Sequence, residues 1–353
     1  MEHHPHRARK AQQYLLGAVK VAVSAALLGY LFAKAARDDS FQQLRDQPKE
    51  WGLLAAALAV ELAAVMLTIV RWRLLVRAVE LPFTFAEAFR LGFLGFLLNF
   101  FTLGVVGGDA IRAVFVARSN PGRGAVAVAT VVVDRVLGLL GLMVLVSISF
   151  FLVDWNTVET RDPEGLLVIQ NLCRVALVGT AVGAAGLGVL LLPGFTTSPL
   201  WDLFTGLPGV GTTFAHLIEA LRMYRRRIDL LVVALVMSLG VHGLLAVAIY
   251  LIAHGLPGQT PGFLEHLVIS PMASAFGSLP LPGGLGAFEV ALDFLYRRVS
   301  PERVAESQGF VIALAYRVVT LLIAAIGVGY YLTSRREVRR LMAEAKKQRQ
   351  DPA

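Results

Sequence analysis

The residues of this sequence that could do chemistry are ionisable side chains placed inside long apolar segments. They are Glu61, Asp134, Arg135, Arg174, His242 and Arg317. If such a segment crosses a bilayer, each charge near its centre costs about 2.5 to 3.5 kcal/mol, so it needs a partner or a wet cavity. At 1.5 Å per residue, Arg135 lies about 15 Å and Arg317 about 12 Å from the start of its segment, which predicts that both reach mid-membrane.

Glycine clusters interrupt two other apolar stretches and supply complementary chemistry. Residues 86–116 are broken at 104–108, and residues 263–296 are broken at 280–286. Each stretch predicts two half-helices around a turn. Gly107-Gly108 and Gly283-Gly284 precede the outgoing half-helices, whose N-terminal N–H groups and dipole would face an anion such as phosphate.

An acidic residue adjoins each break. Asp109 follows the first glycine pair, and Glu289 lies one turn into the second outgoing half-helix. These carboxylates either neutralise Arg135 and Arg317 when no ligand is bound, or cap their own helices. Alternatively, Arg135 and Arg317 form ion pairs with a purely structural role. Helix packing and a role along a substrate pathway are both open for three further residues: Glu61, Asp134 and Arg174.

The composition places most of the chain in a membrane. Of 353 residues, 56% are hydrophobic and only 16% are charged, with a mean hydropathy of +0.65, and a soluble fold cannot bury that much apolar surface. The net charge of +8 does not indicate nucleic-acid binding, because the basic residues lie between apolar segments or at the ends. The single cysteine, Cys173, excludes an intrachain disulfide and a cysteine metal site.

We predict an all-α integral membrane protein with about six full transmembrane helices and two re-entrant hairpins in one polytopic domain, residues 1–353. The continuous spans are residues 14–33, 51–70, 125–153, 166–192, 230–253 and 309–332. The basic loop 222–227 and the basic tail 333–353 predict a cytoplasmic side that also holds both termini, in the inner membrane. The acidic loop 154–165 is expected outside. This topology requires the basic segment 297–307 to lie outside as well, and its rival is that each interrupted stretch crosses fully.

An internal repeat favours the re-entrant topology. A span, a glycine-broken hairpin and an arginine-bearing span occur in that order in residues 51–153 and again in residues 228–332. The arginine-bearing spans align at Asp134-Arg135-Val136-Leu137 and Tyr316-Arg317-Val318-Val319. In the predicted topology the two copies are inverted, an arrangement common among secondary transporters. Chance similarity between apolar helices is the alternative.

Two segments outside this repeat have alternative interpretations. The first apolar segment ends near Ala33-Lys34-Ala35, which imitates a signal-peptidase site, but it is longer than a signal h-region of roughly 7 to 15 residues, so we expect an uncleaved helix. The loop 193–229 ends in a helical pattern with an apolar face and arginines. It predicts either an interfacial helix or a solvated linker.

Catalytic and metal-binding patterns are missing from the sequence. It contains no His-Glu-x-x-His, no Gly-x-Ser-x-Gly, no Walker loop and no cysteine pair. His242, His254 and His266 recur every twelve residues, which does not return to one helix face. We therefore expect neither an enzyme nor a cofactor.

Four motifs carry a resemblance to a known family. They are Gly107-Gly108-Asp109-Ala110-Ile111-Arg112, Asp134-Arg135-Val136-Leu137-Gly138-Leu139, Leu281-Pro282-Gly283-Gly284-Leu285-Gly286-Ala287-Phe288-Glu289 and Tyr316-Arg317. With them the chain resembles the flippase-like transmembrane domain of lysylphosphatidylglycerol synthases over nearly its full length. The first motif departs from the family pattern, which has a proline before Gly-Gly-Asp.

The resemblance implies a lipid-moving role and a set of head-group contacts. The implied contacts are Arg112, Arg135, Gly283, Gly284, Glu289 and Arg317. Only about 20 polar residues follow the last span, so the aminoacyl-transferase domain of the full synthases, and with it lysyl transfer, is not expected.

The favoured hypothesis is a translocator that moves an anionic phospholipid or polyprenyl-phosphate lipid between leaflets. The alternative is a non-transporting partner that presents lipid to a separate glycosyltransferase or synthase. An intramembrane enzyme is the weakest hypothesis, because no acid, base and nucleophile can be assembled. With no ATP-binding motif, ion coupling or a downhill gradient would drive transport.

Overall fold

The computed structural model describes residues 22–37, 40–101, 105–158, 160, 162–192, 194, 211–278, 286–299 and 307–333. All regular secondary structure in these ranges is helical. Residues 22–37 form a helix, and the following elements are α2 (Ser40–Asp46), α3 (Trp51–Ala78), α4 (Phe85–Phe101), α5 (Val105–Ser119), α6 (Gly124–Leu152), α7 (Pro163–Leu191), α10 (Gly211–Arg225), α11 (Ile228–Gly255), α12 (Phe263–Gly277), α13 (Ala287–Arg298) and α14 (Gln308–Thr333). The all-α prediction is confirmed.

Five of the described helices, α3, α6, α7, α11 and α14, are long and apolar enough to cross a membrane. They correspond to five predicted spans. α3 is longer than predicted, since it continues past residue 70 to Ala78. Of the predicted first span, residues 14–33, the structure describes only the part from residue 22, which is helical.

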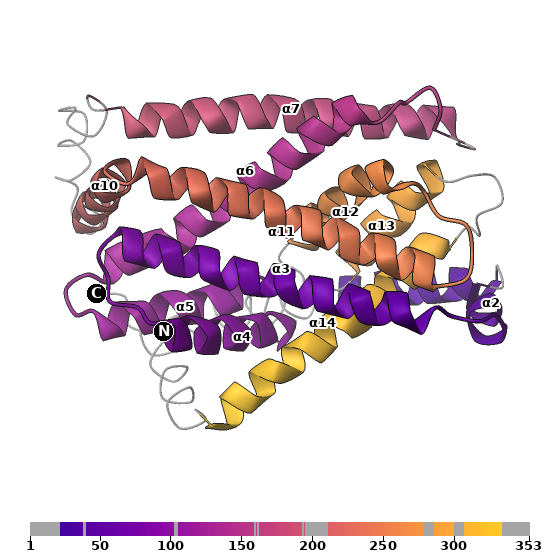
Figure 1. The fold of residues 1–353 in the computed structure, drawn as a ribbon, viewed down its shortest axis with the longest axis horizontal. Coiled ribbons are helices and arrows are strands. Elements are labelled where there is room, and N and C mark those ends of the chain that lie inside the picture. The colour runs from indigo at the N-terminus through magenta and orange to yellow at the C-terminus, as the bar shows by residue number, and fades with distance from the viewer. Residues whose placement is uncertain are drawn as a thin grey trace, which may run out of the picture.

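Each glycine-broken stretch forms a hairpin that returns to the end of the bundle where it started. We call α4 and α5 the first hairpin and α12 and α13 the second. Figure 1 shows the first hairpin opening toward the end of the bundle near α10, and the second opening toward the opposite end, near α2. Within the described residues neither stretch runs the full length of the bundle, which favours the re-entrant topology over full crossing. The connecting residues 102–104 and 279–285, with Gly283 and Gly284, lie outside the described residues.

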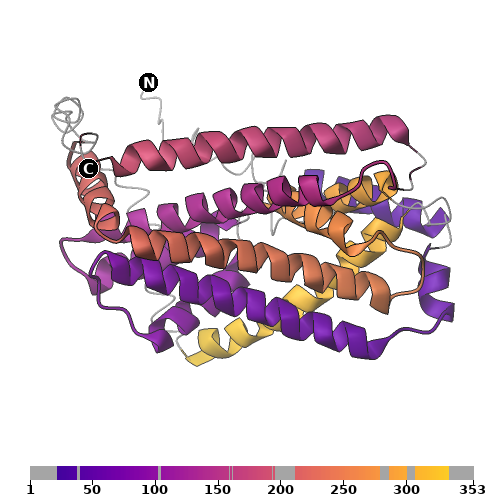
Figure 2. The same cartoon turned by 45° about the horizontal axis from the view of Figure 1, so that its top comes forward.

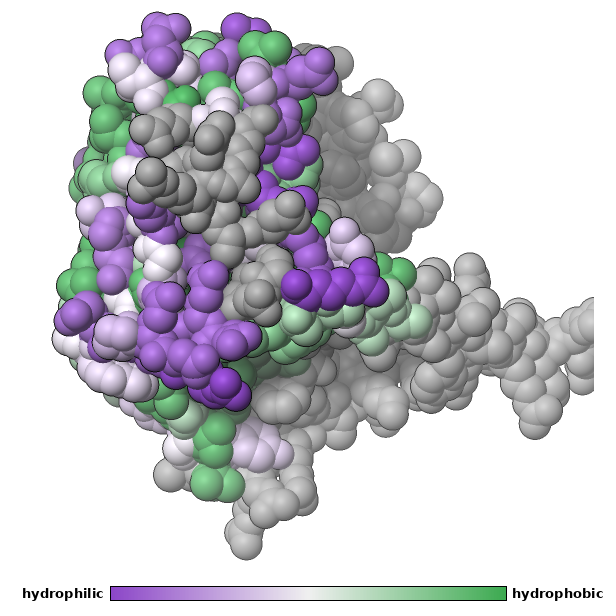
Figure 3. Space-filling model, turned by 90° about the vertical axis from the view of Figure 1, so that its right-hand side faces the viewer, coloured by the Kyte–Doolittle hydropathy of each residue, from purple (hydrophilic) through white to green (hydrophobic). Residues whose placement is uncertain are grey.

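The basic helix α10 lies across one end of the bundle, beside the start of α11 (Figure 2). It carries Arg222 and Arg225 in its last turn. The predicted helix in loop 193–229 is thus present. The opposite end is shown in Figure 3, where hydrophilic residues gather and hydrophobic residues lie along the side of the molecule. This pattern fits polar ends around an apolar belt.

The described start of the basic segment 297–307, residues 297–299, lies beside the acidic loop, as the predicted topology requires. Arg298, at the end of α13, lies 3.7 Å from Asp162 at the start of α7, and its backbone carbonyl accepts a hydrogen bond from the Thr160 hydroxyl at 2.6 Å. Arg297 pairs with Asp293 at 3.3 Å. Local acidic partners thus compensate the charges of two of the three arginines, and Arg303 lies outside the described residues.

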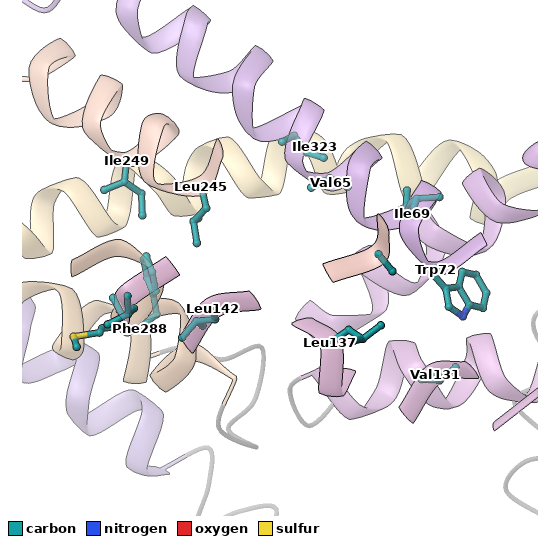
Figure 4. Packing of buried hydrophobic residues seen from close by; sticks show 14 of the residues in the cluster. Val65, Ile69, Trp72, Val131, Leu137, Leu142, Leu245, Ile249, Phe288 and Ile323 are labelled. Atoms are coloured by element: carbon teal, nitrogen blue, oxygen red, sulfur yellow. The ribbon is translucent and has the colours of Figure 1, made fainter. Parts of the chain in front are cut away.

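The interior is packed through large apolar side chains and small residues. Figure 4 shows Trp72, Leu137, Ile249 and neighbouring side chains filling the space between α3, α6, α11 and α14. Gly141 of α6 lies directly against Ser238 of α11, where an added Cβ would collide with the serine side chain. Such small residues allow the close helix approach that drives association in lipid.

The outer surface is apolar, as a lipid-facing surface must be. Along α6 and α14 the side chains of Val132, Val136, Val318 and Leu322 are more than half exposed. α7 lies at the edge of the bundle against α6, and the apolar part that could span a membrane is only 6% buried. Helix α7 therefore takes little part in the interior of the protein.

Candidate functional site

A polar cavity of about 290 Å³ lies in the middle of the bundle. Both hairpins and the long helices α3, α6, α11 and α14 contribute to its wall. Its ionisable and amide-bearing lining residues are Glu61, Asn99, Arg112, Arg135, His242, Tyr316 and Arg317. A cavity this polar at mid-bundle gives intramembrane charges the wet or paired surroundings that they require.

The first arginine of the cavity forms a two-point ion pair with the first hairpin. Arg135 of α6 donates from Nε and from one terminal nitrogen to the two carboxylate oxygens of Asp109, each at 2.6 Å. Asp109 lies on α5, 26 positions earlier in the chain. The side chain of Arg135, which lines the cavity, is still 44% exposed. The predicted pairing of Asp109 with Arg135 is present.

Arg112 lies deeper in the same wall. It is 7% exposed, stands 3.7 Å from Asp109 and donates to the backbone carbonyl of Gly92 at 3.2 Å. Its guanidinium lies 5.4 Å from the ring centre of Trp72. Its Nε has no hydrogen-bond partner. A second buried guanidinium thus shares the Asp109 carboxylate with Arg135.

The second hairpin repeats this arrangement with Arg317 of α14. Arg317 donates from two nitrogens to Oε1 of Glu289 on α13, at 3.0 and 2.6 Å. The other oxygen, Oε2, accepts the backbone N–H of Gly286 at 2.8 Å and so caps α13. Gly286 has φ +92°, a conformation that favours glycine. Both predicted roles of Glu289, neutralising an arginine and capping its helix, are thus filled at once.

The tips of the two hairpins meet at Arg317. Its guanidinium lies 5.9 Å from the ring centre of Phe100, at the end of α4, and 5.9 Å from that of Phe288, at the start of α13. Both phenylalanines line the cavity. The end of α4 and the start of α13 thus approach each other at the cavity wall, as the broken stretches predicted.

The role of the first glycine pair differs from the prediction. Helix α5 begins at Val105, so Gly107 and Gly108 lie inside its first turn rather than before it. The N–H of Gly108 donates to Oδ1 of Asn99 on α4 at 3.1 Å, which satisfies one of the free donors of a helix start. A Cβ on Gly108 would meet the backbone of Gly95, so the glycine lets α4 and α5 touch.

Asp134 belongs to a separate, structural ion pair outside the cavity lining. Its Oδ1 accepts Nε of Arg71 at 2.9 Å, and Arg71 also donates to the Ser238 hydroxyl at 2.7 Å. Both charged side chains are almost fully buried. Sequence reasoning missed Arg71 because the predicted span ended at residue 70. An arginine only one residue beyond that boundary, in a continuing helical pattern, was the available signal.

The remaining candidates divide between the cavity and the surface. Glu61 lines the cavity and accepts the Tyr316 hydroxyl on Oε1 at 2.9 Å. His242 lines it too, with Nε2 3.0 Å from the carbonyl oxygen of Gly138. Arg174 is exposed on α7 and donates to the Asn171 side chain at 2.8 Å. Helix α7 contributes nothing to the cavity lining, so the structure does not bring Arg174 to the site.

Asn99 is a site residue that the sequence did not single out. It lines the cavity and holds Gly108. The available signal was a single amide in the apolar run Phe93-Leu94-Gly95-Phe96-Leu97-Leu98-Asn99-Phe100. Across the described ranges no group of three or more His, Cys, Asp or Glu side chains could hold a metal ion.

Long apolar helices and two opposed hairpins around a polar cavity define a multi-pass membrane protein. Residues 17–327 match the family described as lysylphosphatidylglycerol synthase TM region. The chain therefore belongs to this family. The family suggests a membrane protein of lipid metabolism or of the flippase type. A search of curated proteins returned no match.

Proposed function

We propose that the protein moves an anionic lipid between leaflets, holding its phosphate in the central cavity. The supporting observation is that three guanidinium groups, those of Arg112, Arg135 and Arg317, line one cavity between two hairpin tips. Guanidinium groups bind phosphate oxygens through paired, charge-assisted hydrogen bonds. A phospholipid and a polyprenyl-phosphate lipid both offer this group, while their tails stay in the bilayer.

The carboxylates act as substitutes for the phosphate. Asp109 forms an ion pair with Arg135, and Glu289 forms one with Arg317, each with a nitrogen-to-oxygen distance of 2.6 Å. An incoming phosphate competes for the same nitrogens, so the guanidinium groups exchange one anion for another and never stand bare. This exchange lowers the cost of an empty cavity in the membrane, where an unpaired charge is expensive.

Movement between leaflets follows from inverted repeats. In each of the two units, residues 51–153 and 228–332, an arginine of a long helix forms an ion pair with an acidic residue of the neighbouring hairpin. We propose that these units rock against each other around the cavity, as inverted repeats do in secondary transporters. The basic α10 end faces the cytoplasm of the inner membrane, together with both termini.

Lipid translocation in reconstituted vesicles tests the proposal. Fluorescent phosphatidylglycerol on the outer leaflet is bleached with dithionite, and the protected fraction reports movement. Arg135→Gln and Arg317→Gln are each expected to slow the protein-dependent rate at least about tenfold, a loss of about 1.4 kcal/mol. Arg174→Gln, an exposed arginine on α7, is the matched control and keeps the wild-type rate.

Arg317→Gln also leaves Glu289 unpaired, so a second variant is needed. The neutral pair Glu289→Gln with Arg317→Gln removes both charges of that ion pair, keeps an oxygen that can accept the Gly286 N–H, and is expected to fold like the wild type. If this double variant moves lipid at the wild-type rate, the phosphate site is wrong. Lipid that binds but does not move would favour a partner that presents lipid to a glycosyltransferase or synthase. A new product formed from the lipid would show an enzyme, which we do not propose.

A further inference from the structure

Within the part of the chain that the structure describes, Glu61 is the one buried carboxylate that has no cationic partner. Among the described residues the buried carboxylates are Glu61, Asp134, Glu289 and Asp293. Asp134 pairs with Arg71, and Glu289 pairs with Arg317. Asp293 pairs with both Lys34 and Arg297. Glu61 is only 5% exposed and has no ion pair within the described part of the chain. Its Oε1 accepts the Tyr316 hydroxyl, and its Oε2 has no hydrogen-bond partner.

Glu61 is also placed deep in the membrane. It lies ten residues after Trp51, about 15 Å from the start of α3, and its side chain reaches the cavity. The charged and titratable groups on the elements packed around this wall are Asp109 and Arg112 of α5, Asp134 and Arg135 of α6, His242 of α11, Glu289 of α13, and Tyr316 and Arg317 of α14. Helix α4 offers the neutral Asn99.

The charges of the cavity can be counted in the two states of Glu61. The arginines at positions 112, 135 and 317 contribute three positive charges, and Asp109 and Glu289, which pair with them, contribute two negative charges. Counting His242 as neutral, an ionised Glu61 makes the site neutral, and a protonated Glu61 leaves it with one positive charge. A phosphodiester head group brings one negative charge. Proton and lipid together therefore restore neutrality.

We propose that Glu61 takes up one proton on Oε2 when an anionic lipid head group binds, so that proton and lipid travel together. This inference rests on the proposed lipid translocation. The proton enters and leaves with the head group, and the Tyr316 hydroxyl keeps its hydrogen bond to Oε1 in both states. Since an anion favours the protonated carboxyl, a protonated carboxyl favours the anion by the same factor.

Binding of phosphatidylglycerol to the purified full chain tests the linkage, because this phosphodiester keeps its charge between about pH 5 and about pH 9. We expect wild-type affinity to fall about tenfold as the pH rises through this range and Glu61 ionises. Glu61→Gln, which imitates the protonated carboxyl, should keep the low-pH affinity throughout. Glu164→Gln, a matched change at an exposed position in the first turn of α7, should retain the wild-type pH dependence.

Vesicles with a pH indicator inside supply the second measurement. Wild-type protein should acidify them when labelled lipid moves inward, and Glu61→Gln should move lipid without acidification. The proposal is overturned if wild type and Glu61→Gln show the same pH dependence of binding, or if both carry protons. If neither binds the lipid, or if Arg135→Gln leaves binding unchanged, the translocator proposal fails first.

Discussion

The buried pair of Arg71 and Asp134 makes a quantitative stability prediction. Their side chains are 6% and 3% exposed. The distance from Nε of Arg71 on α3 to Oδ1 of Asp134 on α6 is 2.9 Å. Asp134→Leu removes the carboxylate and leaves Arg71 with one hydrogen bond, to Ser238. Losing one partner of a buried pair costs about 3 to 5 kcal/mol, and an unpaired arginine inside a membrane costs about 2.5 to 3.5 kcal/mol. We expect a loss of about 3 kcal/mol in the free energy of unfolding.

Equilibrium unfolding in mixed micelles with added dodecyl sulfate, followed by helical circular dichroism, measures this loss. The double variant Arg71→Met with Asp134→Leu replaces both charges by apolar groups of similar size, and should recover to within about 1 kcal/mol of the wild type. Arg174→Met, an exposed arginine of α7, should change stability by less than about 0.5 kcal/mol.

Two results would refute this reasoning. A loss below about 1 kcal/mol for Asp134→Leu would mean that water or lipid head groups reach Arg71, contrary to its burial. A double variant as unstable as the single one would mean that the charges themselves hold the three helices together. In addition, because the pair lies outside the cavity lining, a folded double variant should move lipid at the wild-type rate.

Further predictions concern the first hairpin and the topology. Gly108→Ala pushes a methyl group into the backbone of α4 at Gly95 and should lower the free energy of unfolding by about 1 to 3 kcal/mol in the same assay. The control Gly186→Ala, in open space on α7, should be neutral or slightly stabilising. Equal effects of the two variants would mean that α4 and α5 do not touch at Gly108. The topology predicts that Asn156→Cys reacts with a membrane-impermeant maleimide in intact cells, and that Arg226→Cys reacts only after lysis. The native Cys173 is buried and should give little background labelling. The reverse labelling pattern would invert the orientation.

Much of the fold was predictable because the bilayer constrains it strongly. A segment that crosses must be long and apolar with every backbone group bonded internally, so α3, α6, α7, α11 and α14 are readable as hydropathy alone. Proline and glycine in residues 280–286 predict a break, and α12 ends at Gly277 before α13 begins at Ala287. The pairs of Asp109 with Arg135 and of Glu289 with Arg317 were foreseeable as alternatives, because few carboxylates lie near either break.

Other features depend on neighbours that are distant in sequence. The partner of Asp134 lies 63 positions away on α3, and that of Glu61 lies 255 positions away on α14. No periodicity within one helix specifies which helices face each other. Gly107 and Gly108 illustrate the same point, since a glycine pair that suggests a helix break on its own is accommodated inside α5 because α4 supplies Asn99 and a close backbone.

The sequence by itself therefore determined which segments enter the membrane, where two of them break, and which charges need a partner, because these follow from the cost of exposing polar groups to lipid. Only the tertiary structure decided which charge meets which. It separated Asp134 and Arg174 from the cavity, and among the described residues it gave Glu61, in the cavity, no cationic partner. The physical reason is that a buried ion pair depends on a distance of a few ångströms between helices, and packing alone sets that distance.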